Sequence, residues 1–204
     1  MTKKINRLGL RTYPRAISLK DGSKVTLRCM TPSDRDRALA FARALPLHDL
    51  LFLRRDITRP EIIDLWLDGI KRERIISLLA ERDGVVLGYA TVDRGELSWS
   101  PHVAELRVMV AASMRRQRLG RLLTHEAFFI AVGVGVEKMV AQMTADQEGA
   151  IAVFEEMGFH TEALLRDHVK DREGHKHDLL IMANDVERFL AQMEAYGVTE
   201  ALEG

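Results

Sequence analysis

Hydrophobic and polar positions follow two different periods along this chain of 204 residues. Strict alternation is typical of strands with one buried face, whereas a spacing of about three to four is typical of amphipathic helices. The alternating stretches predict a hairpin over 17–30 and further strands over 75–81, 85–92, 103–111, 138–144, from 159 and over 177–182. The helical spacing predicts helices over 31–44, from 58, from 119, over 148–157 and from 184.

Residues with capping preferences mark where two of the helices begin. Thr31 precedes Pro32 and the acidic Asp34, an order typical of a helix N-terminus. Thr58 and Glu61 have the spacing of a capping box. The apolar residues expected to form the buried stripe of this second helix are Ile62, Leu65, Trp66 and Ile70.

The order of the elements predicts the fold class. Hairpins with turns at 21–22 and 83–84 come first, and strands and helices then alternate until a last hairpin with its turn at 171–174. This order indicates an α/β fold with a mixed sheet and helices on both faces. We expect a flexible basic arm over 1–15, one domain over 16–183, and a C-terminal helix over 184–204 that packs on the domain or extends from it.

Composition narrows the class of protein. Thirty Lys and Arg balance thirty Asp and Glu, so net charge favours neither nucleic acid nor an anionic membrane as a partner. Cys29 is the one cysteine, which excludes an internal disulfide and suits the cytoplasm. The longest apolar run, 127–136, is too short to cross a bilayer.

The segment 105–123, ELRVMVAASMRRQRLGRLL, predicts a strand, an arginine-rich turn and an apolar helix. Free backbone N–H groups at a helix N-terminus bind phosphate groups, and Gly120 lets the backbone approach such a ligand closely. Four positive charges lie within seven residues, at Arg115, Arg116, Arg118 and Arg121. The alternative interpretation is an ordinary solvated helix start.

This segment resembles the acetyl-CoA-binding motif of the GNAT superfamily of N-acetyltransferases. The family turn reads Gln/Arg-x-x-Gly-x-Gly/Ala, and Arg115 and Gly120 match its ends, whereas Arg118 replaces the first glycine. The stretch 150–159 resembles a second family signature, with Ala150 in place and Phe154 where tyrosine is usual. Gln147 stands where the signature has asparagine, and the segment 164–182 resembles the closing hairpin of the protein- and amino-acid-acetylating branches.

The resemblance implies a mostly antiparallel twisted sheet with one splayed parallel pair, and an enzyme that transfers an acetyl group from acetyl-CoA to an amine. It implies Glu105 as the general base, and a main-chain N–H near Met109 or Val110 as the donor to the thioester oxygen. The residues expected at acetyl-CoA are Val108, Met109, Val110, Arg115, Arg116, Gln117, Arg118, Leu119, Gly120, Arg121, Gln147, Ala150 and Phe154. A left-handed φ suits arginine poorly, so at Arg118 a negative φ is the tolerable alternative, from which the side chain could reach a phosphate.

The sequence does not identify the acceptor, which is either a protein lysine or N-terminus, or a small amine or amino acid. A homodimer is one expected assembly. Phe52, Arg54 and Arg55 are candidates for acceptor specificity, and His168 for an acceptor contact. Trp66 and Trp99 are expected in the core or in a lid. The rival function is a non-catalytic acyl-CoA-binding module, because Arg118, Gln147 and Phe154 depart from the family pattern.

Two further possibilities are less favoured. A nucleotide-binding protein would need a Walker lysine or a dinucleotide glycine set, and the sequence has neither. His175 and His177 lie on one strand face, but the neighbouring Asp178 would point to the other face, so we expect a polar turn and no metal site.

Overall fold

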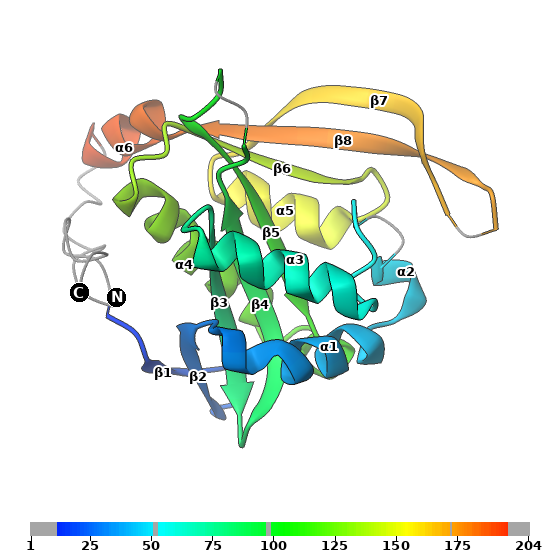
Figure 1. The fold of residues 1–204 in the computed structure, drawn as a ribbon. Coiled ribbons are helices and arrows are strands. Elements are labelled where there is room, and N and C mark those ends of the chain that lie inside the picture. The colour runs from blue at the N-terminus through cyan, green and yellow to red at the C-terminus, as the bar shows by residue number, and fades with distance from the viewer. Residues whose placement is uncertain (1–11, 51–52, 97–98, 172, 196–204) are drawn as a thin grey trace.

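The structure is a computed structural model that describes residues 12–50, 53–96, 99–171 and 173–195 (Figure 1). Most of the expected arm 1–15 and the end of the segment 184–204 lie outside these ranges. No helix in the described ranges is both long and apolar enough to cross a membrane.

One sheet of eight strands organises the described residues, in the order β1-β2-β3-β4-β5-β6-β8-β7. The strands are β1 (Arg15–Ser18), β2 (Lys24–Cys29), β3 (Ile75–Arg82), β4 (Val85–Asp93), β5 (Val103–Val110), β6 (Lys138–Thr144), β7 (His160–Lys170) and β8 (Lys176–Asp185). Strands β5 and β6 are parallel, and all other neighbours are antiparallel. The mixed sheet predicted from the sequence is therefore confirmed, including its one parallel pair.

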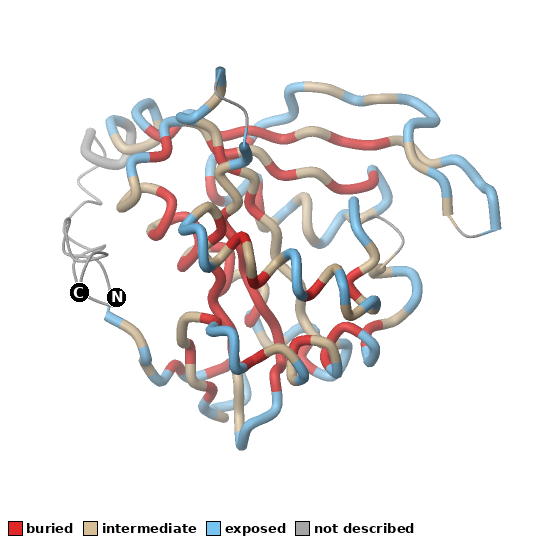
Figure 2. The backbone as a smooth tube through the Cα atoms, viewed as in Figure 1, coloured by how far each residue is buried: buried red, intermediate tan, exposed pale blue. Residues whose placement is uncertain are grey.

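Helices cover both faces of the sheet, as predicted (Figure 1). They are α1 (Arg35–Ala44), α2 (Leu47–Leu50), α3 (Pro60–Lys71), α4 (Leu119–Gly133), α5 (Glu148–Glu156) and α6 (Val186–Ala195), with 3-10 turns η2 (Pro32–Asp34) and η3 (Ala112–Met114). Leu78 packs in the cluster under α4, and its neighbour Leu79 packs in the cluster under α1 and α3. Because successive side chains of a strand point to opposite faces, the central strands are buried on both sides (Figure 2).

The two predicted helix starts have different outcomes. Thr31 and Asp34 do form a capping arrangement, in which the Thr31 N–H donates to Asp34 Oδ2 at 2.8 Å. The Thr58–Glu61 capping box is wrong, because Arg59 is the N-cap of α3 and makes no side-chain cap. The Thr58 hydroxyl instead donates to Asp56 Oδ1 at 2.6 Å, since aspartate two residues earlier competes for it in a local turn.

The expected buried stripe of α3 is confirmed for Ile62, Trp66 and Ile70, which are partly buried against the core, and wrong for Leu65. Ile63 and Leu67 face the core, whereas Leu65 is 49% exposed. Ile62, Leu65 and Trp66 line a cavity beside the sheet. The helix is apolar on two adjacent sides, and periodicity alone cannot tell which side meets the sheet and which meets a cavity.

Strands β5 and β6 are paired at one end only. Their register runs from Val103 opposite Lys138 to Glu105 opposite Val140, yet β5 continues to Val110 and β6 to Thr144. β5 keeps its pairing with β4 as far as Val110. The two parallel strands therefore separate immediately after Glu105, which agrees with the expected splayed pair.

Candidate active site

Two cavities meet where β5 and β6 separate. The larger, of about 520 Å³, lies between α3 and the sheet, and the smaller, of about 80 Å³, lies between β5, β6 and α5. Both are lined by Arg54, Glu105, Arg107 and Gln142. The predicted catalytic Glu105 thus lies at the junction of the two cavities.

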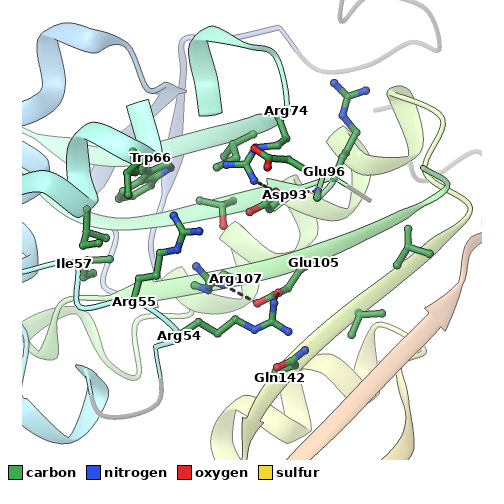
Figure 3. Close-up of a pocket in the computed structure, with 18 of the residues that line it drawn as sticks. Arg54, Arg55, Ile57, Trp66, Arg74, Asp93, Glu96, Glu105, Arg107 and Gln142 are labelled. Atoms are coloured by element: carbon green, nitrogen blue, oxygen red, sulfur yellow. Dashed lines mark hydrogen bonds and ion pairs between the residues drawn. The ribbon is translucent and has the colours of Figure 1, made fainter. Parts of the chain in front are cut away.

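Each carboxylate oxygen of Glu105 faces a guanidinium group (Figure 3). Arg107, two residues further along β5 on the same face, donates from Nη2 to Oε1 at 2.7 Å. Arg54 Nη1 lies 3.1 Å from Oε2. Glu105 is mostly buried, whereas the Arg54 side chain is 60% exposed, so Oε2 is the oxygen with the more mobile partner.

Two polar side chains from neighbouring strands line the larger cavity, the charged Arg107 on β5 and the neutral Tyr89 on β4. Burial opposes the charge of Arg107, but Glu105 and Tyr89 outweigh it and hold the pKa of the guanidinium above its ordinary value. Burial raises the pKa of Tyr89 to about 12, so its phenol is neutral at physiological pH. Sequence reasoning missed Tyr89, because it stands in the apolar run that forms β4 and only its hydroxyl distinguishes it from core residues.

The smaller cavity brings together five residues expected at acetyl-CoA. Val108 and Met109 come from β5, and Gln147, Ala150 and Phe154 come from the start and the inner face of α5. Phe154 is 6% exposed and packs edge-on against Phe159 with ring centroids 5.0 Å apart. Phe154 is therefore both a core residue and a wall of this cavity.

Val110, the last residue of β5 and another residue expected at acetyl-CoA, lies beside the N-terminus of α4. A Cβ placed on Gly120 would lie 3.6 Å from Val110 Cγ2, an ordinary contact. The glycine is therefore not required by the packing of the protein itself. The first three helical residues, Leu119, Gly120 and Arg121, have backbone N–H groups without an intrahelical acceptor, and the first bond of the helix is from Leu122 N–H to the Arg118 carbonyl.

The turn before α4 contains two residues in the left-handed region, Arg116 with φ 63° and Arg118 with φ 65°. A negative φ at Arg118 was the tolerable alternative expected from the sequence, and the structure contradicts it. Arg118 is the N-cap of α4, and the chain must reverse there to connect η3 to the helix, which outweighs the modest cost of the conformation. Alternating left-handed residues at a helix start orient N–H groups into an anion-binding concavity.

The four arginines of the turn divide into two pairs. Arg115 Nη2 lies 2.5 Å from Asp49 Oδ2, and Arg121 forms an ion pair with Glu156. Arg116 and Arg118 form no ion pair with any described residue and are exposed. They are the two side chains of the turn whose charge is available to a ligand.

Helix α2 contributes Asp49 to the lining of the smaller cavity. Asp49 pairs with Arg115 in the turn before α4, while His48 Nε2 lies 3.5 Å from Asp146 Oδ2 in the loop after β6. Sequence reasoning missed this helix, because four residues are too few to show a helical period.

The expected specificity residues have mixed outcomes. Arg54 and Arg55 do line the larger cavity, and Phe52 lies outside the described residues. Trp66 lines the same cavity and donates from Nε1 to Ser77 Oγ at 2.8 Å. Trp99 is 80% exposed, so its expected place in the core is wrong, and the exposed His168 lines neither cavity.

The histidines of the last hairpin meet on Asp171, which sequence reasoning did not consider. Asp171 Oδ2 lies 3.2 Å from His175 Nδ1 and 3.1 Å from His177 Nε2. The hydrogen bond from His177, with others from the turn, lowers the pKa of Asp171 to about 2. Asp171 also accepts the backbone N–H groups of Glu173 and His175, so the cluster closes the turn between β7 and β8, away from both cavities.

Comparisons with known proteins agree with this geometry. The profile of the acetyltransferase (GNAT) family matches residues 35–159, while a search of curated proteins gave no match. The fold is similar to a ribosomal-protein-alanine N-acetyltransferase from Brucella melitensis, with a TM-score of 0.69 and 28% identity over 78% of this chain and 98% of that one.

Two further solved structures share the fold at lower identity. An N-acetyltransferase from Staphylococcus aureus Mu50 has a TM-score of 0.72 and 20% identity, covering 80% of this chain and 99% of that one. A phosphinothricin acetyltransferase from Sinorhizobium meliloti, solved with acetyl-CoA, has a TM-score of 0.70 and 18% identity, covering 79% and 88%. With the family profile covering more than half of the sequence, the chain belongs to the acetyltransferase (GNAT) family.

Proposed function

We propose that this protein transfers an acetyl group from acetyl-CoA to the amine of an acceptor. The observation that carries the proposal is the position of Glu105, which lines both cavities where β5 and β6 separate. The smaller cavity is lined by Asp49, which pairs with Arg115 of the turn before α4, and the larger cavity has room for an acceptor. A proton-accepting carboxylate at their junction is what amine acylation requires.

The residues of this chain fit acetyl-CoA in two places. The free N–H groups of Leu119, Gly120 and Arg121, with the unpaired Arg116 and Arg118 and the adjacent Gln117, suit a pyrophosphate. The cavity between β5 and α5 suits the pantetheine arm. Its walls are Val108 and Met109 on one side and Gln147, Ala150 and Phe154 on the other, with Val110 next to the turn.

Bound acetyl-CoA supplies the activated thioester, and a C–N bond forms as the C–S bond breaks. An alkylammonium with a pKa near ~10.4 must first lose a proton. Glu105 accepts that proton directly or through a water, and an entering ammonium group can displace the exposed Arg54 from Oε2. Of the two protons that the nitrogen loses in all, one ends on the thiol and the other is released.

The reaction does not need a tyrosine at position 154. With a thiol pKa near ~8.5, releasing the thiolate unprotonated at neutral pH costs about 2 kcal/mol. Of the two candidate donors to the thioester oxygen, the Met109 N–H points toward β4, in the same direction as the Ala111 N–H that donates to the Leu87 carbonyl. The Val110 N–H points to the side from which β6 has separated, and it donates to the thioester oxygen.

Several finer features are part of the proposal. The acceptor classes are a protein lysine or N-terminus, a small amine, and an amino acid, and the similarity to a ribosomal-protein-alanine acetyltransferase supports the N-terminus. The single cysteine supports a cytoplasmic location. A homodimer is the assembly that sedimentation should test first.

The experiment combines calorimetry of acetyl-CoA binding with a thiol-release assay over protein and small-amine acceptors. We expect binding and acceptor-dependent release of thiol. If acetyl-CoA binds tightly but no acceptor gives thiol release above the buffer rate, the acyl-CoA-binding module is favoured instead. That alternative is suggested by Arg118, Gln147 and Phe154, which depart from the family pattern.

A further inference from the structure

The larger cavity carries an excess of positive charge, which bears on the acceptor class left open by the proposed function. Three carboxylates line it, from Asp93, Glu96 and Glu105. Five arginines line it as well, namely Arg54, Arg55, Arg74, Arg94 and Arg107. A site that binds only an ammonium group would be expected to have the opposite balance, because like charges repel in a partly enclosed cavity.

The carboxylates of the cavity already have guanidinium partners. Glu105 faces Arg54 and Arg107, as described above. Arg74 lies 3.5 Å from Asp93 and 3.6 Å from Glu96, while its buried Nε makes no hydrogen bond with a described residue. No carboxylate lining the cavity is therefore left to neutralise a further guanidinium group.

Arg55 and Arg94 are the two lining arginines without a carboxylate partner among the described residues, and of these two the exposed Arg55 has no partner of any kind among those residues. It forms no ion pair or hydrogen bond with any described residue, whereas Arg94 donates to the Glu73 carbonyl. In the view of Figure 3 the Arg55 side chain extends into the cavity, between Trp66 and Arg107. A guanidinium group aimed into a cavity without a protein partner suits a carboxylate of the ligand, which it can bind through two parallel hydrogen bonds.

One wall of the cavity is apolar. Ile57, Ile62, Leu65 and Trp66 line it, and Leu65 is 49% exposed. Trp66 is held in place by its hydrogen bond to Ser77 and by Tyr89, with ring centroids 4.7 Å apart. An apolar side chain of the acceptor would cover this surface and remove it from water.

We infer that the acceptor is a free α-amino acid with a large apolar side chain. Resting on the proposed acetyl transfer, the inference places the amine at Glu105, the carboxylate at Arg55, and the side chain against Ile62, Leu65 and Trp66. A lysine side chain or a polyamine brings only positive charge to the cavity. A peptide N-terminus has no carboxylate next to its amine, because that carboxyl group is an amide.

The test uses acceptors that differ in one group. L-phenylalanine, L-phenylalaninamide and 2-phenylethylamine share the amine and the ring, and L-alanine keeps the carboxylate without the ring. An alanine-starting peptide represents a protein N-terminus. We expect kcat/KM in the thiol-release assay to be about tenfold or more higher for phenylalanine than for the amide or the amine, the gain typical of a charge-assisted hydrogen bond. Alanine should also be about tenfold or more poorer because it lacks the ring that covers the apolar wall, and the alanine-starting peptide lacks the free carboxylate as well.

Arg55→Gln should remove most of the preference for phenylalanine over phenylalaninamide while leaving the kcat/KM for the amide within a few-fold. Arg188→Gln, the same substitution at an exposed site on α6, should keep the preference. A parent enzyme that acetylates the amide, the amine or the peptide as well as phenylalanine overturns the inference but leaves acetyl transfer intact. An unchanged preference in Arg55→Gln also overturns it, whereas absence of both acetyl-CoA binding and thiol release overturns the proposed function and the inference together.

Discussion

Arg54 and Glu105 lie 3.1 Å apart, one in the segment after α2 and the other on the central strand β5. This ion pair connects the segment that contains Arg54, which lines both cavities, to Glu105, the residue at which β5 and β6 separate. Because the Arg54 side chain is exposed and Glu105 is mostly buried, the pair can open from the Arg54 side without moving the sheet. This arrangement gives Glu105 a fixed position and one oxygen that a substrate can reach.

Glu105→Gln should lower kcat/KM about a hundredfold, in the range typical of a lost general base, and should flatten its rise with pH. The affinity for acetyl-CoA should stay within a few-fold of the parent, because the proposed contacts to the phosphate groups come from the turn before α4 and not from Glu105. Calorimetry and pH–rate profiles measure the two effects. Glu187→Gln on α6 is the matched control, and an unchanged pH–rate profile in Glu105→Gln would reduce Glu105 to a structural residue.

Gly120→Val should weaken acetyl-CoA binding about tenfold or more, or about 1.4 kcal/mol, because its side chain would fill the space beside the free N–H groups of α4. Gly120→Ala is the control. Its Cβ makes an ordinary 3.6 Å contact with Val110 Cγ2, so the protein should fold and bind within a few-fold of the parent. If calorimetry gives the same affinity for a folded Gly120→Val protein, the phosphate groups bind elsewhere.

Phe154→Tyr should keep kcat at the parent value or raise it, because the new hydroxyl can lie in the smaller cavity where the thiolate departs. Thermal melts should show a change in unfolding free energy below about 1 kcal/mol. A loss of about 1–3 kcal/mol without a gain in kcat would mean that the hydroxyl is buried without a partner. Phe154 would then be a core residue alone.

Asp34 should make stability depend on pH in the acid range. It is fully buried, and although burial by itself raises its pKa, hydrogen bonds from Arg28 and Thr31 outweigh this and lower the pKa to about 2. Because the pKa is lower in the folded state than in the unfolded state, the ionised carboxylate stabilises the protein fully at a pH above the unfolded pKa of about 3.9. This stabilisation is lost as the pH falls toward the folded pKa of about 2. The shift corresponds to about 2–3 kcal/mol.

Chemical denaturation of the parent and of Asp34→Asn at pH 6 and pH 3 tests this pair. We expect the variant to be about 3–5 kcal/mol less stable at pH 6, because Arg28 loses a buried partner, and the difference to shrink at pH 3. A difference independent of pH would show that Asp34 contributes through packing rather than through its charge.

The sequence by itself determined the strands, the longer helices and their order, whereas the four-residue helix α2 gave no periodic signal. Alternation identified the strands, Asp83-Gly84 gave a two-residue turn, and the run from Glu105 to Gly120 identified the strand, turn and helix of the acetyltransferase motif. These features depend on residues close together in the chain, so local preferences and periodicity are enough to predict them.

The tertiary structure decided what the chain brings together over long distances. Periodicity could not show that Leu65 faces a cavity while Leu67 faces the core, because both lie on apolar sides of one helix. It could not show that Asp49 pairs with Arg115, or that Arg54 reaches Glu105, since each contact joins residues more than fifty positions apart. The excess of arginine in the larger cavity exists only once the segment before α3, β4 and β5 are folded around it, because residues far apart in the chain contribute to it.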